Sequence, residues 1–297
     1  MIATFPNFTK LELEDKETVR AITARFEPYA DFSFVNLLAW GQDEAAELSL
    51  LHGNVVVRLP DYYTGETTMY TLIGEHKIDQ TVADLLTITD RIQLVPEVVV
   101  ERLMTPHAFA ITEDRDNDDY VYHVPTLATL SGGDYKKKRN KVHAFTDFMG
   151  DAVHTEVLTQ LDTTQVRELQ NVFQQWMLGN NKTEAESSSE RIALDNLLAN
   201  KPHEDLRFTI VRIHGEVCAF SIHEISVHSY AICHFEKALP VHPGLYSYII
   251  QQATRDLEAQ GVQWVNWQQD LGMPGLRKAK MSYRPAKFLK KYTIAAL

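Results

Sequence analysis

Cysteine is scarce in this sequence, because a chain of 297 residues contains only Cys218 and Cys233. Two cysteines are too few for a disulfide framework, which favours a reducing compartment. Both lie in segments with a β-strand pattern and without a nucleophile signature, so we expect small core residues and no covalent catalysis.

Long apolar runs and metal-binding motifs are also missing. No window offers about 18 uninterrupted apolar residues, and the first residues lack a basic segment followed by an apolar one. The histidines and cysteines form no HExxH or paired CxxC motif. We therefore expect a cytoplasmic protein with no integral membrane segment and no metal site.

Positive charge is in the minority but is concentrated in two places. The chain has 29 Lys and Arg against 40 Asp and Glu, a net charge of −11, which argues against DNA binding through an overall positive field. Residues 271–297 nevertheless contain seven basic residues and no acidic one, and a second basic run covers residues 136–141. These two basic islands predict a site for a confined anionic ligand, with two solvated surface faces as the alternative.

The length suits two compact domains, and 44% of the residues are apolar, as in ordinary globular proteins. The polar, acidic segment 112–120 is the best candidate for a domain junction or an exposed connecting loop. We expect an N-terminal domain over residues 1–125 and a C-terminal domain over residues 126–297 that carries the active site.

Hydrophobic periodicity predicts strands and helices in both halves. In the first half, strands at residues 47–51 and 54–59 flank the tight turn His52–Gly53, a helix covers residues 78–87, and β-type residues return at 93–101. The second half has strand patterns at residues 153–158, 208–213, 217–225, 229–236 and 262–267, and helix patterns at residues 134–149, 163–177, 188–199 and 244–260. This order predicts a mixed sheet with helices packed on it.

Polar, Gly and Pro residues crowd the segment after the predicted strand 262–267, and ligand crevices favour the carboxyl ends of strands in open α/β sheets. Asp270 is a candidate general base there, and Arg277 and Lys280 are candidates to neutralise a phosphate or a developing oxyanion. The alternative is that Asp270 caps a turn and pairs with Arg277.

Glu236 ends a predicted strand shortly before Pro243–Gly244, where the chain turns into a helix. Free N–H groups at a helix start attract anions, so Gly244 is a candidate for donor binding and Glu236 for proton removal. The alternatives are ordinary helix punctuation at Gly244 and a strand-end salt bridge between Glu236 and Lys237 or another cation.

Several blocks, in order along nearly the whole chain, carry a family resemblance. They are YADFSFVNLLAW (29–40), LSGGDYKKKRNKVHAF (130–145), HFEKA (234–238) with PGLYSYI (243–249), and QDLGMPGLRKAKMSYRPAKFLKKYT (269–293). The last block is long enough to be specific. Together they resemble the phosphatidylglycerol lysyltransferase C-terminal-like family, whose tandem arrangement is shared with the Fem-type aminoacyltransferases.

The resemblance implies an α/β fold with mixed sheets, in which two GNAT-like acyltransferase domains follow in tandem. It also implies transfer of an activated acyl or aminoacyl group to an amine or hydroxyl acceptor. The donor would be anionic, aminoacyl-tRNA or acyl-CoA, with no tightly bound cofactor. On the residues and the family pattern together, the catalytic candidates are Asp270, Glu236 and Tyr246. The candidates for donor or phosphate binding are Gly244, Arg277, Lys280, Lys138, Arg139, Tyr135 and Asn140.

Departures from the family pattern narrow this expectation. The pyrophosphate signature of GNAT enzymes, Gln/Arg-x-x-Gly-x-Gly/Ala, is absent around Gly244, which weakens acyl-CoA as the donor. Gln268 and Gln269 stand where relatives tend to carry an acidic residue, which weakens a mechanism with two carboxylates. The missing membrane region weakens phosphatidylglycerol as the acceptor. The alternative function is a non-catalytic binding protein for a nucleotide, a tRNA end or an anionic metabolite, and the oligomeric state is left open.

Overall fold

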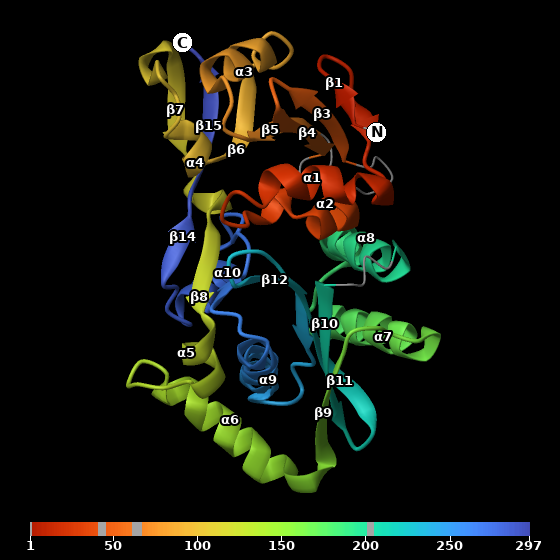
Figure 1. Ribbon diagram of the computed structural model, residues 1–297. Helices are drawn as coiled ribbons and strands as arrows, with labels where there is room; N and C mark the ends of the chain where they lie inside the picture. The colour runs from red at the N-terminus through yellow and green to blue at the C-terminus, as the bar shows by residue number, and fades with distance from the viewer. Residues whose placement is uncertain (1, 41–45, 61–66, 201–204) are drawn as a thin grey trace. The chain divides into compact units, whose positions relative to one another are not determined.

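The computed structural model describes residues 2–40, 46–60, 67–200 and 205–297, which form two compact units (Figure 1). Unit 1 comprises Met1–Tyr120, Gln268–Lys278 and Phe288–Leu297, and unit 2 comprises Val121–Trp267 and Ala279–Lys287. The two units are therefore not consecutive halves of the chain. The division into domains at residue 125 stays a prediction. The compact units differ from it because two C-terminal segments belong to unit 1.

Unit 1 contains short helices and two small sheets. Its elements are β1 (Ala3–Thr4), β2 (Thr9–Lys10), α1 (Lys16–Thr23), α2 (Phe34–Trp40), β3 (Glu47–Leu51), β4 (Asn54–Pro60), β5 (Thr68–Ile73), α3 (Ile78–Leu85), β6 (Arg91–Pro96), α4 (Glu97–Val100), β7 (Phe109–Glu113) and β15 (Lys291–Ala296). One sheet has the order β1-β3-β4-β5, with β2 also paired to β3, and the other has the order β6-β15-β7.

The core of unit 1 joins residues from the two ends of the chain. The predicted hairpin is confirmed, since β3 and β4 pair antiparallel around His52 and Gly53, which both have positive φ angles. The C-terminal strand β15 lies between β6 and β7, and Ile294 is buried in one cluster with Val82, Val95 and Val99. The six residues of β15 thus complete a sheet whose other strands come from the first half of the sequence.

Unit 2 is built on longer elements. They are α5 (Val124–Thr129), α6 (Lys136–Met149), β9 (Val153–Leu158), α7 (Thr163–Gly179), α8 (Glu184–Asn200), β10 (Leu206–Ile213), β11 (Glu216–Ile225), β12 (Tyr230–Ala238), α9 (Leu245–Ala259) and β13 (Trp264–Asn266). Three further elements contain three of the four points where the chain passes from one unit to the other: β8 (Asp119–His123), α10 (Pro274–Met281) and β14 (Lys287–Leu289). The fourth point follows Trp267.

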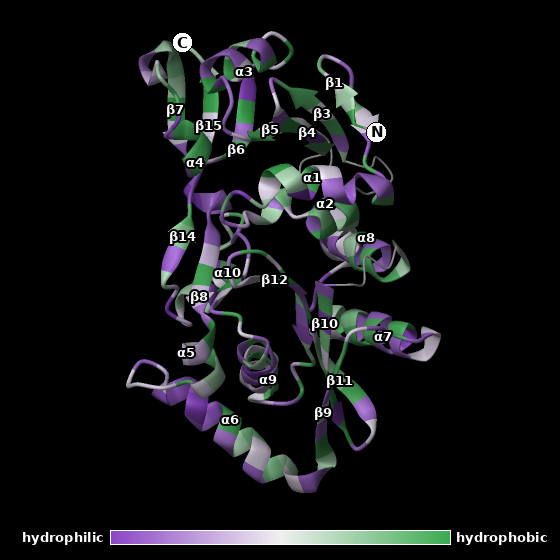
Figure 2. Cartoon of the chain, viewed as in Figure 1, coloured by the Kyte–Doolittle hydropathy of each residue, from purple (hydrophilic) through white to green (hydrophobic). Residues whose placement is uncertain are grey.

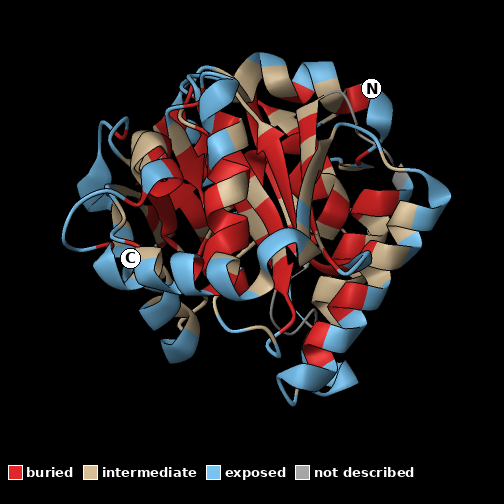
Figure 3. Cartoon of the chain, turned by 90° about the horizontal axis from the view of Figure 1, so that it is seen from below, coloured by how far each residue is buried: buried red, intermediate tan, exposed pale blue. Residues whose placement is uncertain are grey.

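The strands of unit 2 belong to a seven-stranded sheet with the order β14-β8-β13-β12-β11-β10-β9. Helix α9 packs against β10, β11 and β12 on one face, while α7 packs against β11 and β12 on the other, and α8 packs beside α7 (Figure 1). Figure 3 shows the strands largely buried, whereas the helices keep exposed outer faces. This arrangement confirms the predicted mixed sheet with helices on it.

The helices of unit 2 follow from local sequence. Helix α7 begins with a capping box in which the Asp162 side chain accepts hydrogen bonds from the backbone N–H groups of Thr164 and Gln165, and it buries Leu169 and Val172 on one face. Helix α6 begins with hydrophilic turns, as Figure 2 shows, and buries only Val142 and Phe145. In the part of the chain that the structure describes, no helix is long and apolar enough to cross a membrane.

Two predictions from the sequence pattern are wrong in detail. Residues 97–100, expected to continue a strand, form the short helix α4 after Pro96, and Val99 is buried there in the core of unit 1. The polar segment 112–120, predicted as a domain junction or an exposed loop, is not an exposed loop throughout: Asp119 and Tyr120 begin β8 and are completely buried, and the first stretch of unit 1 ends at Tyr120. The charged residues of this segment predicted that it would be exposed, but ion pairs and hydrogen bonds stabilise the residues that are buried.

Candidate functional site

Strand β12 has an edge that is only partly paired, and this edge defines the candidate site in unit 2. The parallel ladder between β12 and β13 joins Tyr230, Ala231 and Ile232 to residues 264–266 and ends there. Strand β12 continues to Ala238 and stays paired with β11 on its other edge. Among the described residues no strand pairs with the second part of this edge, where Glu236 lies.

Glu236 is a carboxylic acid with one oxygen buried and unsatisfied. Its Oε2 atom has no hydrogen-bond partner in the described part of the chain. Burial raises the pKa of Glu236 to about 8, although the charges of Lys237, Lys280 and Lys138 oppose the shift. A carboxyl group with a pKa near neutrality and a free oxygen has the properties of a general base.

Lys280 is near enough to this carboxyl group for its charge to act on the pKa of Glu236, and it contacts Trp267. The Lys280 ammonium donates a hydrogen bond of 2.5 Å to the backbone oxygen of Trp267, the residue that follows β13. The indole Nε1 of Trp267 is buried and donates to no acceptor among the described residues. The Trp267 ring packs edge to face on Tyr283, with ring centroids 5.2 Å apart.

Lys138 reaches the same group of side chains from α6. Its Nζ lies 3.5 Å from the centroid of the Tyr283 ring and donates a 2.8 Å hydrogen bond to Ser282 Oγ. Burial and the like charge of Lys141 lower the pKa of Lys138 to about 8, against the attraction of Glu236. The structure therefore brings together Glu236, Lys138 and Lys280 in unit 2.

Tyr246 lies in the first turn of α9, beside the end of β12. Its hydroxyl donates a 3.2 Å hydrogen bond to the backbone oxygen of Glu236. On the other face of β12, Lys237 forms a 2.6 Å ion pair with Glu190 and lies 3.9 Å from the centroid of Trp176. The salt bridge predicted as the alternative for Glu236 is therefore absent among the described residues, because Lys237 points away and pairs with Glu190.

Two features require glycine at position 244: the close packing of α6 and the backbone conformation at the start of α9. Its φ angle is +94°, and a Cβ atom there would lie 2.6 Å from the backbone oxygen of Lys141 and 2.9 Å from Cβ of Phe145. The backbone of α6 therefore approaches α9 so closely that only glycine fits. Donor binding at this helix start stays a prediction.

The other three candidates on α6 differ in their contacts. Tyr135 is buried and its hydroxyl donates a 2.7 Å hydrogen bond to the backbone oxygen of Tyr283. Arg139 donates to the backbone oxygens of Leu130 and Gly132 at the end of α5. Asn140 is exposed. Tyr135 and Arg139 thus hold local structure, which leaves Lys138 as the cation of this helix that faces the site.

Asp270 and Arg277 belong to unit 1 and form a closed network there. Asp270 is completely buried and accepts two 2.8 Å hydrogen bonds from Arg277, one of 2.9 Å from the Gly272 N–H and one from the Tyr120 hydroxyl. Arg277 also pairs with Asp116 at 2.5 Å. Burial alone raises the pKa of Asp270, but these donors hold it below its usual value.

The C-terminal basic island is largely neutralised inside each unit. Arg277 pairs with Asp270, Lys290 with Glu113, and Arg284 with Asp134. Lys291 is fully buried between Asp119, 2.7 Å away, and Asp31. Of the two cations of this island that were predicted to bind an anionic ligand, Lys280 lies near Glu236 and Arg277 does not, since the segment 270–283 is divided between the units.

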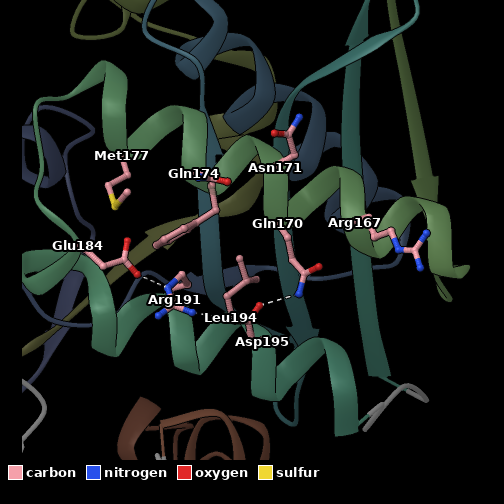
Figure 4. Close-up of a pocket in the computed structure, with 10 residues that line it drawn as sticks. Arg167, Gln170, Asn171, Gln174, Met177, Glu184, Arg191, Leu194 and Asp195 are labelled. Atoms are coloured by element: carbon pink, nitrogen blue, oxygen red, sulfur yellow. Dashed lines mark hydrogen bonds and ion pairs between the residues drawn. The ribbon is translucent and has the colours of Figure 1, made fainter.

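A surface hollow of about 470 Å³ lies between α7 and α8 (Figure 4). Phe173, Met177 and Leu194 contribute apolar surface to it. Four of the polar groups around it bind one another: Gln170 donates to Asp195 at 2.8 Å, and Arg191 pairs with Glu184 at 2.7 Å. Glu236 at the edge of β12 has a buried polar atom without a partner, whereas no described side chain of this hollow has one, so the edge of β12 is the better candidate.

The described residues contain no group of three or more His, Cys, Asp or Glu side chains that could hold a metal ion. Burial raises the pKa of the Cys218 and Cys233 thiols, so neither is an activated nucleophile. Sequence analysis missed Trp267 as a site residue. Its place at the end of the predicted strand 262–267 was the one available signal.

Solved structures show the same fold. A conserved protein of unknown function from Bacteroides thetaiotaomicron VPI-5482 is 27% identical with a TM-score of 0.84, each chain being covered over 100% of its length. L-PGS from Bacillus licheniformis is 13% identical, with a TM-score of 0.63 and coverage of 100% of this chain and 94% of that one. FemX is 9% identical, with a TM-score of 0.59 and coverage of 98% and 97%. The predicted fold, two GNAT-like domains in tandem, is confirmed.

Comparison of the sequence with curated proteins gave no match. The family model "Phosphatidylglycerol lysyltransferase, C-terminal" matches residues 23–295. Family and fold together point to a function of aminoacyl- or acyl-transferase type. The chain belongs to the phosphatidylglycerol lysyltransferase C-terminal family.

Proposed function

We propose that this chain is an aminoacyltransferase whose chemistry takes place at the unpaired edge of β12 in unit 2. An acceptor amine or hydroxyl attacks the activated carbonyl of the donor directly, and Glu236 removes its proton. The buried, unsatisfied Oε2 atom of Glu236 carries this proposal, because an unpaired acceptor beside an unpaired strand edge is costly unless a ligand uses it.

The donor that fits best is aminoacyl-tRNA. The resemblance to Fem-type enzymes favours it, and the missing pyrophosphate signature around Gly244 disfavours acyl-CoA. The cations Lys280 and Lys138 and the start of α9 supply positive potential for the donor's phosphate or for the oxyanion of the tetrahedral intermediate.

The remaining candidates have supporting roles in this proposal. Tyr246 fixes the backbone at Glu236, and Tyr135 and Arg139 position the segment that carries Tyr283 and the start of α6. We assign Asp270 and Arg277 a structural role in unit 1, since each satisfies the other's charge. Asn140 is exposed and available for donor contact.

The test is transfer of label from mixed aminoacyl-tRNA carrying tritiated amino acids, with labelled acetyl-CoA in parallel. Two acceptor pools are offered, phosphatidylglycerol vesicles and a low-molecular-weight amine fraction from a cell extract. We expect label to leave aminoacyl-tRNA with wild type and not with Glu236→Gln. Binding of tRNA that weakens with salt, without any turnover, would instead support the non-catalytic binding protein.

A further inference from the structure

Lys138 differs from the other lysines of α6 in its surroundings. Lys136, Lys137 and Lys141 are exposed, whereas Lys138 is half-buried with its ammonium over the face of Tyr283. Its one hydrogen bond goes to a neutral hydroxyl, Ser282 Oγ, and it forms no ion pair with a carboxylate among the described residues. This ammonium is therefore held in place without being neutralised.

The charged groups around Lys138 come from three elements. Glu236 on β12 attracts its proton, Lys141 on α6 repels it, and Lys280 on α10 acts on the same Glu236. Tyr283, under the ammonium, is an uncharged phenol at neutral pH because burial raises its pKa. The two groups that exchange protons most readily at this place are thus Glu236 and Lys138.

We propose that Lys138 is the general acid of the transfer reaction and Glu236 its base, an inference that rests on the proposed function. The acceptor N–H or O–H loses its proton to the Glu236 carboxylate while its electron pair forms the bond to the carbonyl carbon. The ester bond between that carbon and the donor oxygen breaks, and the leaving oxygen takes a proton from the Lys138 ammonium. A proton then passes from the Glu236 carboxyl group to the Lys138 amine, which restores both groups.

The pH dependence of the rate follows from these roles. Glu236 must be ionised, so the rate rises with pH toward about 8, and Lys138 must be protonated, so the rate falls above about 8. Wild type should therefore give a bell-shaped profile, measured after subtraction of donor hydrolysis without protein.

The variant Lys138→Arg keeps the positive charge but removes a group that can release its proton near neutrality. We expect its kcat for transfer from aminoacyl-tRNA to fall by about 10²-fold with little change in KM, and the alkaline limb to disappear. The same exchange at the exposed Lys10, Lys10→Arg, is the control and should match wild type. A Lys138→Arg enzyme with wild-type kcat and a bell-shaped profile would overturn the inference while leaving the proposed function intact.

A donor that needs no acid separates this role from a structural one. Aminoacyl p-nitrophenyl esters expel a phenolate that leaves without a proton, so they should restore Lys138→Arg toward the wild-type rate but should not restore Glu236→Gln.

Competitive labelling of lysines followed by mass spectrometry measures the titration of Lys138 directly. We expect a midpoint near pH 8 that moves lower in Glu236→Gln, because the attracting charge is lost. The inference is contradicted if Lys138→Arg stays as slow with the activated ester as with aminoacyl-tRNA, or if Lys138 titrates with a midpoint near pH 10.5. If wild type transfers from no donor, the proposed function fails and this role fails with it.

Discussion

Asp270 and Glu236 are two carboxylates with buried oxygens in opposite environments. Asp270 in unit 1 accepts hydrogen bonds from Arg277, Tyr120 and Gly272, and its pKa is held below the usual value. Glu236 in unit 2 leaves one oxygen without a partner, and burial raises its pKa to about 8. A fully paired carboxylate stabilises a fold, whereas an unpaired one can take up a proton during a reaction.

Removal of the charge at Glu236 tests the comparison most strongly. We expect Glu236→Gln to lower kcat by about 10²–10⁴-fold, because a general base contributes that much, without lowering the free energy of unfolding. Transfer kinetics and urea denaturation measure the two effects, with Glu113→Gln on the surface as the control. Transfer at the wild-type rate by Glu236→Gln would remove Glu236 from the mechanism.

The same change at Asp270 should act on stability instead. Asp270→Asn loses the charge-assisted bonds from Arg277, so we expect the free energy of unfolding to fall by about 2–4 kcal/mol. The folded fraction should keep its kcat within a few fold. Asp134→Asn, which disturbs an exposed pair with Arg284, is the control and should change stability by less than about 1 kcal/mol. A folded but inactive Asp270→Asn variant would instead support Asp270 as a catalytic residue.

Two glycines, Gly244 in unit 2 and Gly272 in unit 1, should differ when their stability is measured in the same way. In Gly244→Ala the new Cβ meets the backbone of α6 at 2.6 Å, so we expect a loss of about 2–3 kcal/mol in the free energy of unfolding. In Gly272→Ala it meets the Asp116 side chain, which can move, so the loss should be about 1 kcal/mol. Gly132→Ala has a similar positive φ angle with open space around it and measures the backbone contribution alone. Equal losses at all three positions would mean that close packing adds nothing at Gly244.

The two carboxylates should also give opposite pH signatures in stability. The folded state keeps the Glu236 proton up to about pH 8, whereas the unfolded state loses it near 4.5, so the contribution of Glu236 falls as pH rises between these values. The pKa of Asp270 is lowered on folding, so its contribution is present above about 3.8 and disappears as pH falls through the folded value. Urea denaturation of wild type, Glu236→Gln and Asp270→Asn at pH 3, 5 and 8 measures both trends. A stability of wild type relative to Glu236→Gln that rises from pH 5 to 8 would contradict the assignment.

Local pattern predicted the elements where the signal is local. The hairpin at His52–Gly53 and the strand at residues 153–158 were correct, because turn chemistry and alternation determine them. Helix α10 and strand β15 had no prediction, since eight residues with two glycine or proline positions and a basic tail give no periodic signal. Strand β15 exists because β6 and β7 pair with it from the other half of the chain.

The sequence by itself determined the fold class and the family, because both depend on patterns that can be read without tertiary context, and it supplied the candidate site residues. The tertiary structure decided which of these candidates keep a buried polar atom without a partner. Arg277 is seven positions from Asp270 and was a foreseeable partner, but Tyr120 is 150 positions away. Conversely, no pattern in HFEKA reveals that Glu236 keeps an unpaired oxygen while Lys237 turns to Glu190. The protonation of a carboxyl group depends on its solvent and its partners, and distant parts of the chain supply both.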